Sequence, residues 1–184
     1  MKSIVRNSIV WMVALLSMNA SAQTITPKGE WIKPSNEDIQ YVGRISFKNP
    51  DSPAFTYPGT QIIARFEGTS LKMIAKPMSG YFMAQIDKAE PFKVGFNAPA
   101  DSIVTLAAAL PDGLHEVRLM YIIEGYERKP EFRGFLLDEG KQLADAPALP
   151  ERKIEFIANA ITCGYGIEST NPREHFMDET ENHY

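Results

Sequence analysis

Four stretches between residues 60 and 123 alternate apolar and polar side chains. They are 60–66, 70–76, 81–87 and 115–123. Successive side chains of a β-strand point to opposite faces, so this period is typical of strands that bury one face. We expect one core built from the apolar positions Ile62, Phe66, Leu71, Phe82, Ile86, Val117 and Leu119.

Turn-forming residues separate these stretches. Combinations of Pro, Gly, Asp and Ser occur at 57–59, 67–69, 78–80 and 111–113. No part of the region shows a helical period of useful length. Several short strands at nearly regular spacing predict an all-β sandwich or barrel over about residues 39–138.

The flanking regions have a different composition. Residues 23–38 are polar and contain proline, which predicts an irregular entry segment. Residues 144–150 are rich in alanine and proline and indicate a connector between domains. Ile154 to Ile157 is apolar except for Glu155, as in a strand that is covered on both faces of a parallel α/β sheet.

The N-terminus has the pattern of a signal peptide. Lys2 and Arg6 supply positive charge, and an apolar run from Ile9 to Met18 follows. That run is short for a bilayer, so a cleavable signal is favoured over a membrane anchor. The small residues Ala20-Ser21-Ala22 predict cleavage after Ala22, and therefore a secreted or periplasmic protein that begins at Gln23.

Charge and reactive side chains narrow the possible functions. The formal net charge is −4 and the cations are dispersed, so we expect no nucleic-acid partner. Cleavage of the signal peptide would leave no membrane attachment. Cys163 is the only cysteine, and we interpret it as a small buried residue rather than a reactive thiol. The histidines at 115, 175 and 183 lack ligand spacing, so we predict no metal and no other cofactor.

Three blocks in a fixed order carry a family resemblance. The first is Tyr57-Pro58-Gly59-Thr60 with Ala64-Arg65-Phe66-Glu67-Gly68-Thr69-Ser70; the second is Gly113-Leu114-His115-Glu116-Val117 with Phe132-Arg133-Gly134-Phe135-Leu136-Leu137-Asp138; the third is Arg152-Lys153-Ile154-Glu155-Phe156-Ile157 with Ile161-Thr162-Cys163-Gly164-Tyr165-Gly166. Together they resemble carbohydrate esterase family 2, exported acetyl esterases that deacetylate xylan and related plant polysaccharides.

The resemblance implies a two-part architecture. The family joins a jelly-roll-like antiparallel β-sandwich to an SGNH (GDSL-type) hydrolase domain. We therefore divide the chain into a signal peptide at 1–22, a β-sandwich at 23–140, a linker at 141–152 and the start of an SGNH domain at 153–184.

The nucleophile position departs from the family pattern. The family reads Gly-Asp/Asn-Ser where this chain has Ala158-Asn159-Ala160, and the serine is the nucleophile. The methyl group of Ala160 cannot attack a carbonyl. Thr162 and Cys163 are poor substitutes, because the strand-to-helix turn of this fold directs one particular side chain outward. The family's oxyanion and histidine blocks would lie beyond Tyr184, so we expect a truncated, catalytically inactive esterase.

Aromatic side chains supply the candidates for sugar binding. The candidates are Trp31, Tyr41, Tyr57, Tyr81 and Tyr126. We predict substrate binding, with acetylated xylan as the partner, for Trp31 and Tyr57. Tyr41 and Tyr81 lie in strand-like runs and also fit a core or interface role. His115 is interpreted as a structural hydrogen-bonding residue rather than a catalyst.

Three functional hypotheses stay open at this point. The first is an inactive N-terminal part of an acetylxylan esterase, which the apolar stretch at 154–157 favours. The second is a non-catalytic carbohydrate-binding β-sandwich. The third is an esterase that completes its site with a partner chain.

Overall fold

The computed structural model describes residues 28–125, 127–152, 154, 157, 166–175 and 177–181. These residues form strands, turns and loops but no helix, so none of them belongs to a helix that could cross a membrane. The strands are β1 (Glu30–Ile32), β2 (Gln40–Val42), β3 (Gln61–Gly68), β4 (Leu71–Ala75), β5 (Gly80–Ile86), β6 (Phe92–Phe96), β7 (Ile103–Ala107), β8 (Gly113–Tyr121), β9 (Phe132–Leu137) and β10 (Leu143–Ala144).

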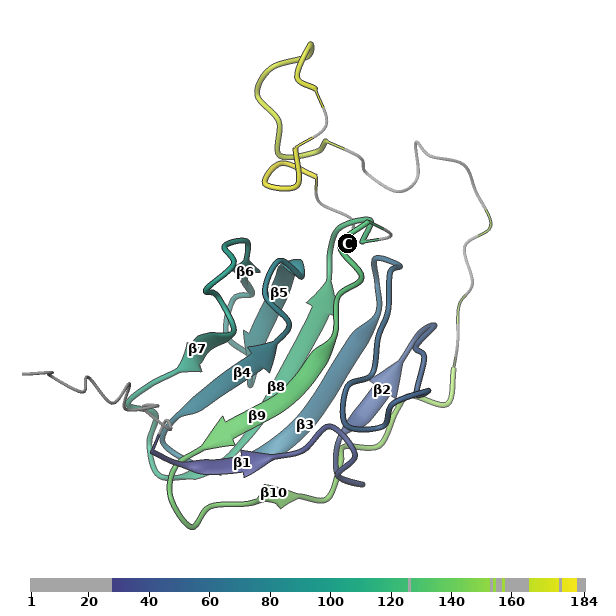
Figure 1. Cartoon of the computed structure of the whole chain (residues 1–184). Coiled ribbons are helices and arrows are strands. Elements are labelled where there is room, and N and C mark those ends of the chain that lie inside the picture. Colours follow the sequence, from purple (N-terminus) through teal and green to yellow (C-terminus); the bar gives the residue numbers. More distant parts are fainter. Residues whose placement is uncertain are drawn as a thin grey trace, which may run out of the picture.

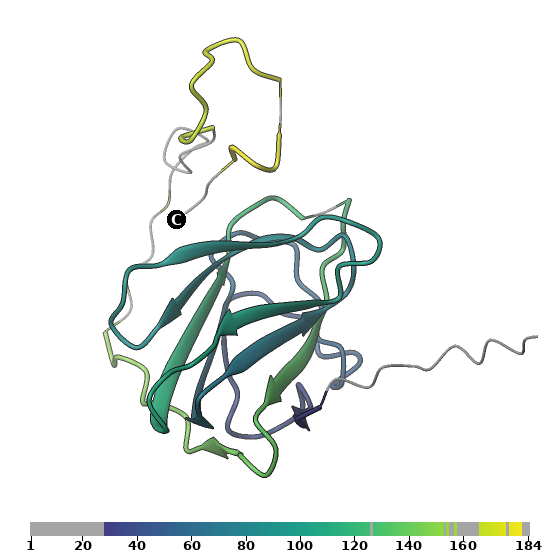
Figure 2. The same ribbon diagram turned by 90° about the vertical axis from the view of Figure 1, so that its left-hand side faces the viewer.

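The strands make two antiparallel sheets that pack face to face (Figures 1 and 2). One sheet has four strands in the order β1-β9-β4-β7. The other has six strands, in the order β10-β3-β8-β5-β6, with β2 also paired to β3. This arrangement confirms the predicted all-β, antiparallel sandwich.

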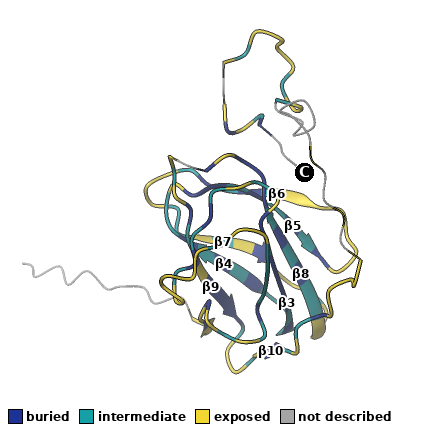
Figure 3. Ribbon diagram, turned by 90° about the vertical axis from the view of Figure 1, so that its right-hand side faces the viewer, coloured by how far each residue is buried: buried dark blue, intermediate teal, exposed yellow. Residues whose placement is uncertain are grey.

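The core lies between the sheets and contains every residue that the alternation assigned to it. Ile62, Phe66, Leu71, Phe82, Val117 and Leu119 are at most 1% exposed, and Ile86 is 7% exposed. Strand register explains this, because Ile62 pairs with Leu119, and Leu119 in turn pairs with Ala84. The inward side chains of β3, β8 and β5 thus form continuous apolar rows. Figure 3 colours the buried residues of the ribbon dark blue.

The sheets extend beyond the predicted limits at both ends. β1 lies in the segment predicted to be irregular, and Trp31 pairs with Leu136 of β9. β10 lies in the predicted linker, and its Leu143 pairs with Phe66 and is buried. Both strands are too short to show a period of their own. Their positions depend on hydrogen bonds to strands far away in the sequence.

The rest of the predicted linker lies over the outer face of the second sheet. Leu149 and Pro150 line one surface hollow together with Ile63 of β3 and Arg118 of β8. Ile63 is 1% exposed although it points away from the core between the sheets. The linker therefore packs on the sandwich over this part of its course.

The predicted strand at 154–157 is described only at its two ends. Ile154 and Ile157 lie outside any strand and are 80% and 91% exposed, which differs from the buried strand that we expected. A strand covered on both faces needs neighbours on each side, and no described strand pairs with these two residues. Residues 155 and 156 lie outside the described residues.

One carboxylate ties the β3–β4 turn to the end of β9. Asp138 Oδ2 accepts hydrogen bonds from the Thr69 amide at 2.6 Å, the Thr69 hydroxyl at 2.9 Å and the Ser70 amide at 3.0 Å. Asp138 Oδ1 accepts a further bond from the Ser70 hydroxyl. These bonds hold the turn that leads from the second sheet into the first.

Candidate functional site

The predicted nucleophile block, residues 158–160, lies outside the described residues, as do Thr162, Cys163, Tyr126 and His183. The role assigned to Ala160 therefore stays a sequence prediction. The next described segment begins at Gly166, six positions after Ala160. We call residues 166–175 and 177–181 the tail segment, and it lies beyond one end of the sheets (Figure 1).

The strand β6 provides the first anchor for the tail segment. The Lys93 ammonium forms an ion pair with Glu168 and donates to the Glu179 carbonyl at 2.9 Å. The same ammonium lies 5.5 Å from the centroid of the Tyr81 ring on β5. Burial and the nearby Glu179 carboxylate raise the pKa of Tyr81, so its phenol remains neutral and can donate. Lys93 thus holds both ends of the tail segment.

Two buried carboxylates provide the second anchor. Asp178 is 6% exposed and forms an ion pair with the guanidinium of Arg128. Glu181 is 1% exposed, and its Oε1 accepts from the Glu124 amide at 3.2 Å. Burial raises the pKa of Asp178, although the Arg128 charge opposes the shift. The loop after β8 therefore supplies the Arg128 guanidinium and the Glu124 amide as partners for the buried carboxylates of Asp178 and Glu181.

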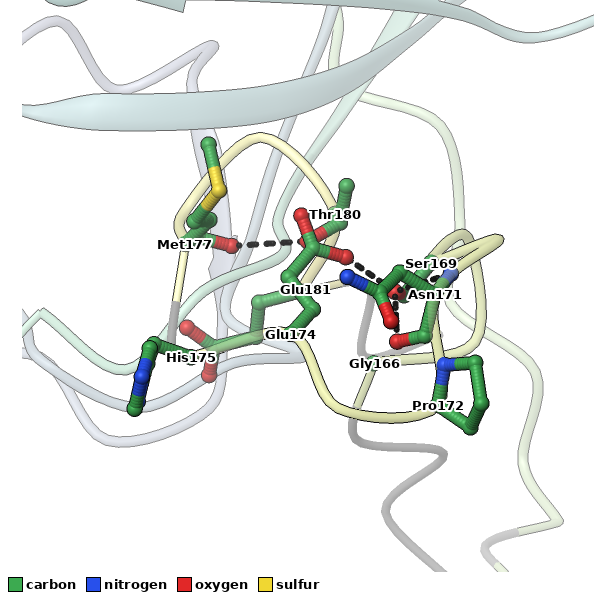
Figure 4. A pocket seen from close by; sticks show the side chains of 9 residues that line it. All are labelled: Gly166, Ser169, Asn171, Pro172, Glu174, His175, Met177, Thr180 and Glu181. Carbon is green, nitrogen blue, oxygen red and sulfur yellow. Dashed lines mark hydrogen bonds between the residues drawn. The ribbon is translucent and has the colours of Figure 1, made fainter.

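A small polar cavity of about 220 Å³ lies within the tail segment (Figure 4). It is lined by Gly166, Ser169, Asn171, Pro172, Glu174, His175, Met177, Thr180 and Glu181. The Ser169 hydroxyl donates to Glu174, while the His175 ring points away from Ser169 (Figure 4). Nucleophilic catalysis needs a hydroxyl within hydrogen-bond reach of a base. Ser169 and His175 do not form such a pair.

The described ranges contain no group of three or more His, Cys, Asp or Glu side chains arranged to hold a metal ion. The carboxylates of the tail segment are instead committed to the contacts given above. Glu174 accepts from Ser169, and Asp178 is paired with Arg128. These contacts hold the tail segment against the sandwich.

Trp31, the first predicted sugar-binding residue, lies on β1 at the edge of the four-stranded sheet. Its side chain is 50% exposed. The indole Nε1 donates to the Arg133 carbonyl at 3.1 Å, and Lys33 Nζ lies 5.8 Å from the ring centroid. Gly134 leaves room for the indole, because a Cβ there would lie 3.0 Å from Nε1. The ring is held in one orientation while half of its surface stays accessible.

Tyr57, the second predicted sugar-binding residue, precedes β3 and is 51% exposed. The Arg44 guanidinium lies 4.9 Å from its ring centroid and donates to its hydroxyl at 3.3 Å. Tyr57 and Arg44 line an open groove of about 460 Å³ together with Lys129 and Glu131. Trp31 does not line this groove, so the structure does not bring the two predicted residues together.

The other sequence candidates have structural contacts. The Tyr41 hydroxyl donates to the Pro34 carbonyl at 2.8 Å, and its ring packs edge-on against Phe47. His115 Nδ1 lies 2.8 Å from Asp87 Oδ2, and its Nε2 lies 2.8 Å from the Pro111 carbonyl. These contacts agree with the structural roles expected for both residues.

Sequence reasoning did not identify the charged residues that anchor the tail segment. Lys93, Arg128, Asp178 and Glu181 belong to no recognisable sequence motif. Their partners lie 50 to 86 positions away. The one available signal was the acidic pair at 178–179 close to Glu181, which also fits an exposed loop.

Comparison with known proteins matches residues 41–147 to the family model for the N-terminal region of carbohydrate esterase 2. The matched residues include strands β3 to β10. They also include the groove lined by Tyr57, Arg44, Lys129 and Glu131, which we call the Tyr57 groove. The match therefore covers most of the sandwich and stops before the predicted nucleophile block.

Individual relatives extend the comparison. Cellulase/esterase CelE of Acetivibrio thermocellus is 37% identical over 152 residues, or 81% of this chain and 18% of that protein. An acetylxylan esterase / glucomannan deacetylase of Cellvibrio japonicus is 26% identical over 155 residues, or 83% of this chain and 43% of that protein. This chain thus spans less than half of either relative.

A solved structure shows the same fold. The family two carbohydrate esterase from Clostridium thermocellum, in complex with cellohexaose, superposes with a TM-score of 0.66 and 33% identity. The superposition covers 78% of this chain and 44% of that chain.

Proposed function

Because this chain belongs to carbohydrate esterase family 2 through its N-terminal domain, we propose that it is the N-terminal part of an exported esterase that deacetylates acetylated xylan-type polysaccharides. The observation that carries the proposal is the family match over residues 41–147. Relatives named as acetylxylan esterase / glucomannan deacetylase support the substrate class. The predicted signal peptide, with cleavage after Ala22, supports export.

The proposal includes a specific defect in catalysis. Ala160 occupies the position that corresponds to the family's nucleophilic serine, and a methyl group cannot form an acyl-enzyme. Backbone amides near this position would have no tetrahedral oxyanion to stabilise, because no attack occurs there. The chain as it stands is therefore inactive as an ester hydrolase.

We propose a positioning role for the sandwich. The tail segment begins six residues after Ala160 and is held on the sandwich by Lys93 and Arg128. In a family member with an intact block, the equivalent contacts would place the nucleophile relative to the sandwich.

Retention on insoluble xylan tests the proposed substrate class. The mature chain, beginning at Gln23, should be retained on acetylated xylan and released from an inert resin of equal surface area. Trp31→Ala or Tyr57→Ala should weaken retention, because both rings are half exposed and held in place. Phe47→Ala, which removes an exposed ring outside both positions, is the matched control. Equal retention of the wild-type chain on both supports would refute the substrate class.

The second candidate function is a non-catalytic carbohydrate-binding β-sandwich. The fixed, half-exposed rings of Trp31 and Tyr57 favour it, because they would bind sugar without help from a catalytic domain. A chain that ends at residue 152 separates the two candidates. A binding sandwich would keep full xylan affinity without residues 153–184, whereas a sandwich that serves the esterase site would lose affinity together with the tail segment.

A further inference from the structure

The Tyr57 groove is built from three chain segments that lie side by side. Ser46 and Ala54 exchange two backbone hydrogen bonds, at 2.8 and 3.1 Å. Ala54 also forms a bridge with Glu131, next to the bond from the Phe55 amide to the Pro130 carbonyl at 3.3 Å. Backbone hydrogen bonds therefore fix the three segments that form the floor of the groove. We call these paired segments the platform, and the side chains that line the groove project from them.

Two cations that line the groove have no carboxylate partner among the residues that the structure describes. Within that part of the chain, Arg44 contacts the Tyr57 ring and hydroxyl, which leaves most of its five N–H donors available. Lys129 forms no ion pair with any residue that the structure describes. Both side chains are exposed and line the same groove as the Tyr57 ring.

The carboxylate in the groove does not cancel these charges. Glu131 accepts from the Ser52 hydroxyl at 2.9 Å and pairs with Arg133 at 3.3 Å and Lys76 at 3.9 Å. Its charge is therefore already balanced by cations other than Arg44 and Lys129. The groove has a net positive character although the whole chain carries −4.

Lys129 is held in a strained backbone conformation. Its φ is +48°, which few residues other than glycine adopt. Its amide donates to the Gly125 carbonyl at 2.8 Å, and its own carbonyl accepts from Lys76 Nζ at 3.0 Å. Strain that is held by several bonds is typical of functional positions. These bonds fix the point from which the Lys129 side chain leaves the platform.

We propose that this groove is a subsite for an acidic sugar, a uronate residue of the polysaccharide. The pyranose ring would contact the exposed part of the Tyr57 ring, and the uronate carboxylate would bind to Arg44 and Lys129. Arginine and lysine both recognise carboxylates, and arginine does so with two parallel donors. This inference rests on the proposed polysaccharide function. It specifies in addition that the bound sugar carries a negative charge.

Affinity electrophoresis through gels with dissolved polymer tests the subsite. One gel contains a glucuronate-bearing xylan and the other contains the same xylan with its carboxyls reduced to alcohols. The wild-type mature chain should be retarded more by the acidic polymer, and added salt should reduce the difference. The double variant Arg44→Gln/Lys129→Gln should lose about tenfold in affinity for the acidic polymer, the scale expected for hydrogen bonds to a charged group. Its affinity for the reduced polymer should be unchanged.

Matched variants separate recognition from folding. Lys88→Gln, which removes an exposed lysine outside the groove, should behave as wild type. Tyr57→Phe keeps the ring and should retain binding to both polymers, whereas Tyr57→Ala should lose it. All variants should share the wild-type circular dichroism spectrum.

The two polymers also separate this inference from the function on which it rests. Equal wild-type affinity for the acidic and reduced polymers would overturn the acidic subsite and leave the polysaccharide function standing. Full retention of the acidic preference by the double variant would overturn it as well. Failure of the wild-type chain to bind either polymer would overturn both proposals.

Discussion

The guanidinium of Arg128 contacts the carboxylate of Asp178, and this pair joins the sandwich to the segment that follows the predicted nucleophile block. Asp178 is 6% exposed, so the contact replaces water around a charged group. Removal of one partner from a buried pair is costly, because the other charge stays buried alone. The position of the tail segment should therefore depend strongly on Arg128.

Arg128→Gln should release the tail segment while leaving the sheets intact. An unpaired buried carboxylate costs about 1–3 kcal/mol, so opening of residues 166–181 should become roughly tenfold or more frequent. Amide hydrogen exchange with peptide resolution measures this directly. Arg133→Gln is the control, because Arg133 is more exposed and pairs with Glu131 at the surface. Equal exchange of residues 166–181 in wild type and Arg128→Gln would show that the pair does not anchor the segment.

Asp138→Asn should destabilise the sandwich at neutral pH. The Ser70 hydroxyl, and after it the donors of Thr69, lower the pKa of Asp138 to about 2. Hydrogen bonds to a charged group contribute about 1.5–3 kcal/mol, and the amide NH₂ of asparagine cannot accept them. Urea unfolding, followed by circular dichroism, gives the free energy of unfolding. Glu139→Gln, which alters an exposed ion pair with Lys28, should change it by less than about 0.5 kcal/mol.

The pH dependence of the Asp138 variant has a definite sign. A carboxyl whose pKa is lowered on folding stabilises the protein above its unfolded pKa of about 3.9, and this stabilisation is lost as pH falls toward the folded value. The deficit of Asp138→Asn should therefore be largest at neutral pH and should shrink as pH falls from about 4 to about 2. A deficit that stays constant over this range would contradict the role of the charge.

His115→Gln should alter the pH dependence of stability near and above neutral pH, whereas Asp138→Asn alters it in acid. Asp87 and then the Pro111 carbonyl raise the pKa of His115, because only the imidazolium donates to both acceptors. Stabilisation is complete below the unfolded pKa of about 6.5 and is lost as pH rises through the folded value. The wild-type Tm should thus fall as pH rises above neutral, and His115→Gln should remove this step. His175→Gln, at an exposed position, should keep it. A step that survives in His115→Gln would rule out His115 as its source.

The fold could be predicted where a strand is long enough to show the alternation of apolar and polar side chains in its own sequence. β3, β4, β5 and β8 alternate over at least five residues each, and their inward positions are the core. β1 and β10 could not be predicted in this way. Trp31 pairs with Leu136, and Leu143 pairs with Phe66, and such long-range pairs leave no local pattern.

The candidate site could be predicted only in part, for the same reason. The exposure of Trp31 and Tyr57 agrees with a binding role, but their placement in separate regions depends on tertiary structure. The free charges of Arg44 and Lys129 become visible only when Glu131 is seen to be paired with other cations. A list of charged residues does not contain this information.

We propose that Ala160 occupies the nucleophile position of a carbohydrate esterase family 2 protein. The most direct test joins this chain to the C-terminal half of a family relative and measures acetate release from acetylated xylan. The unmodified fusion should release no acetate above a buffer blank. The fusion with Ala158→Gly and Ala160→Ser should be faster by a factor of about a thousand or more. Acetate release by the unmodified fusion at the rate of the restored one would contradict the claim.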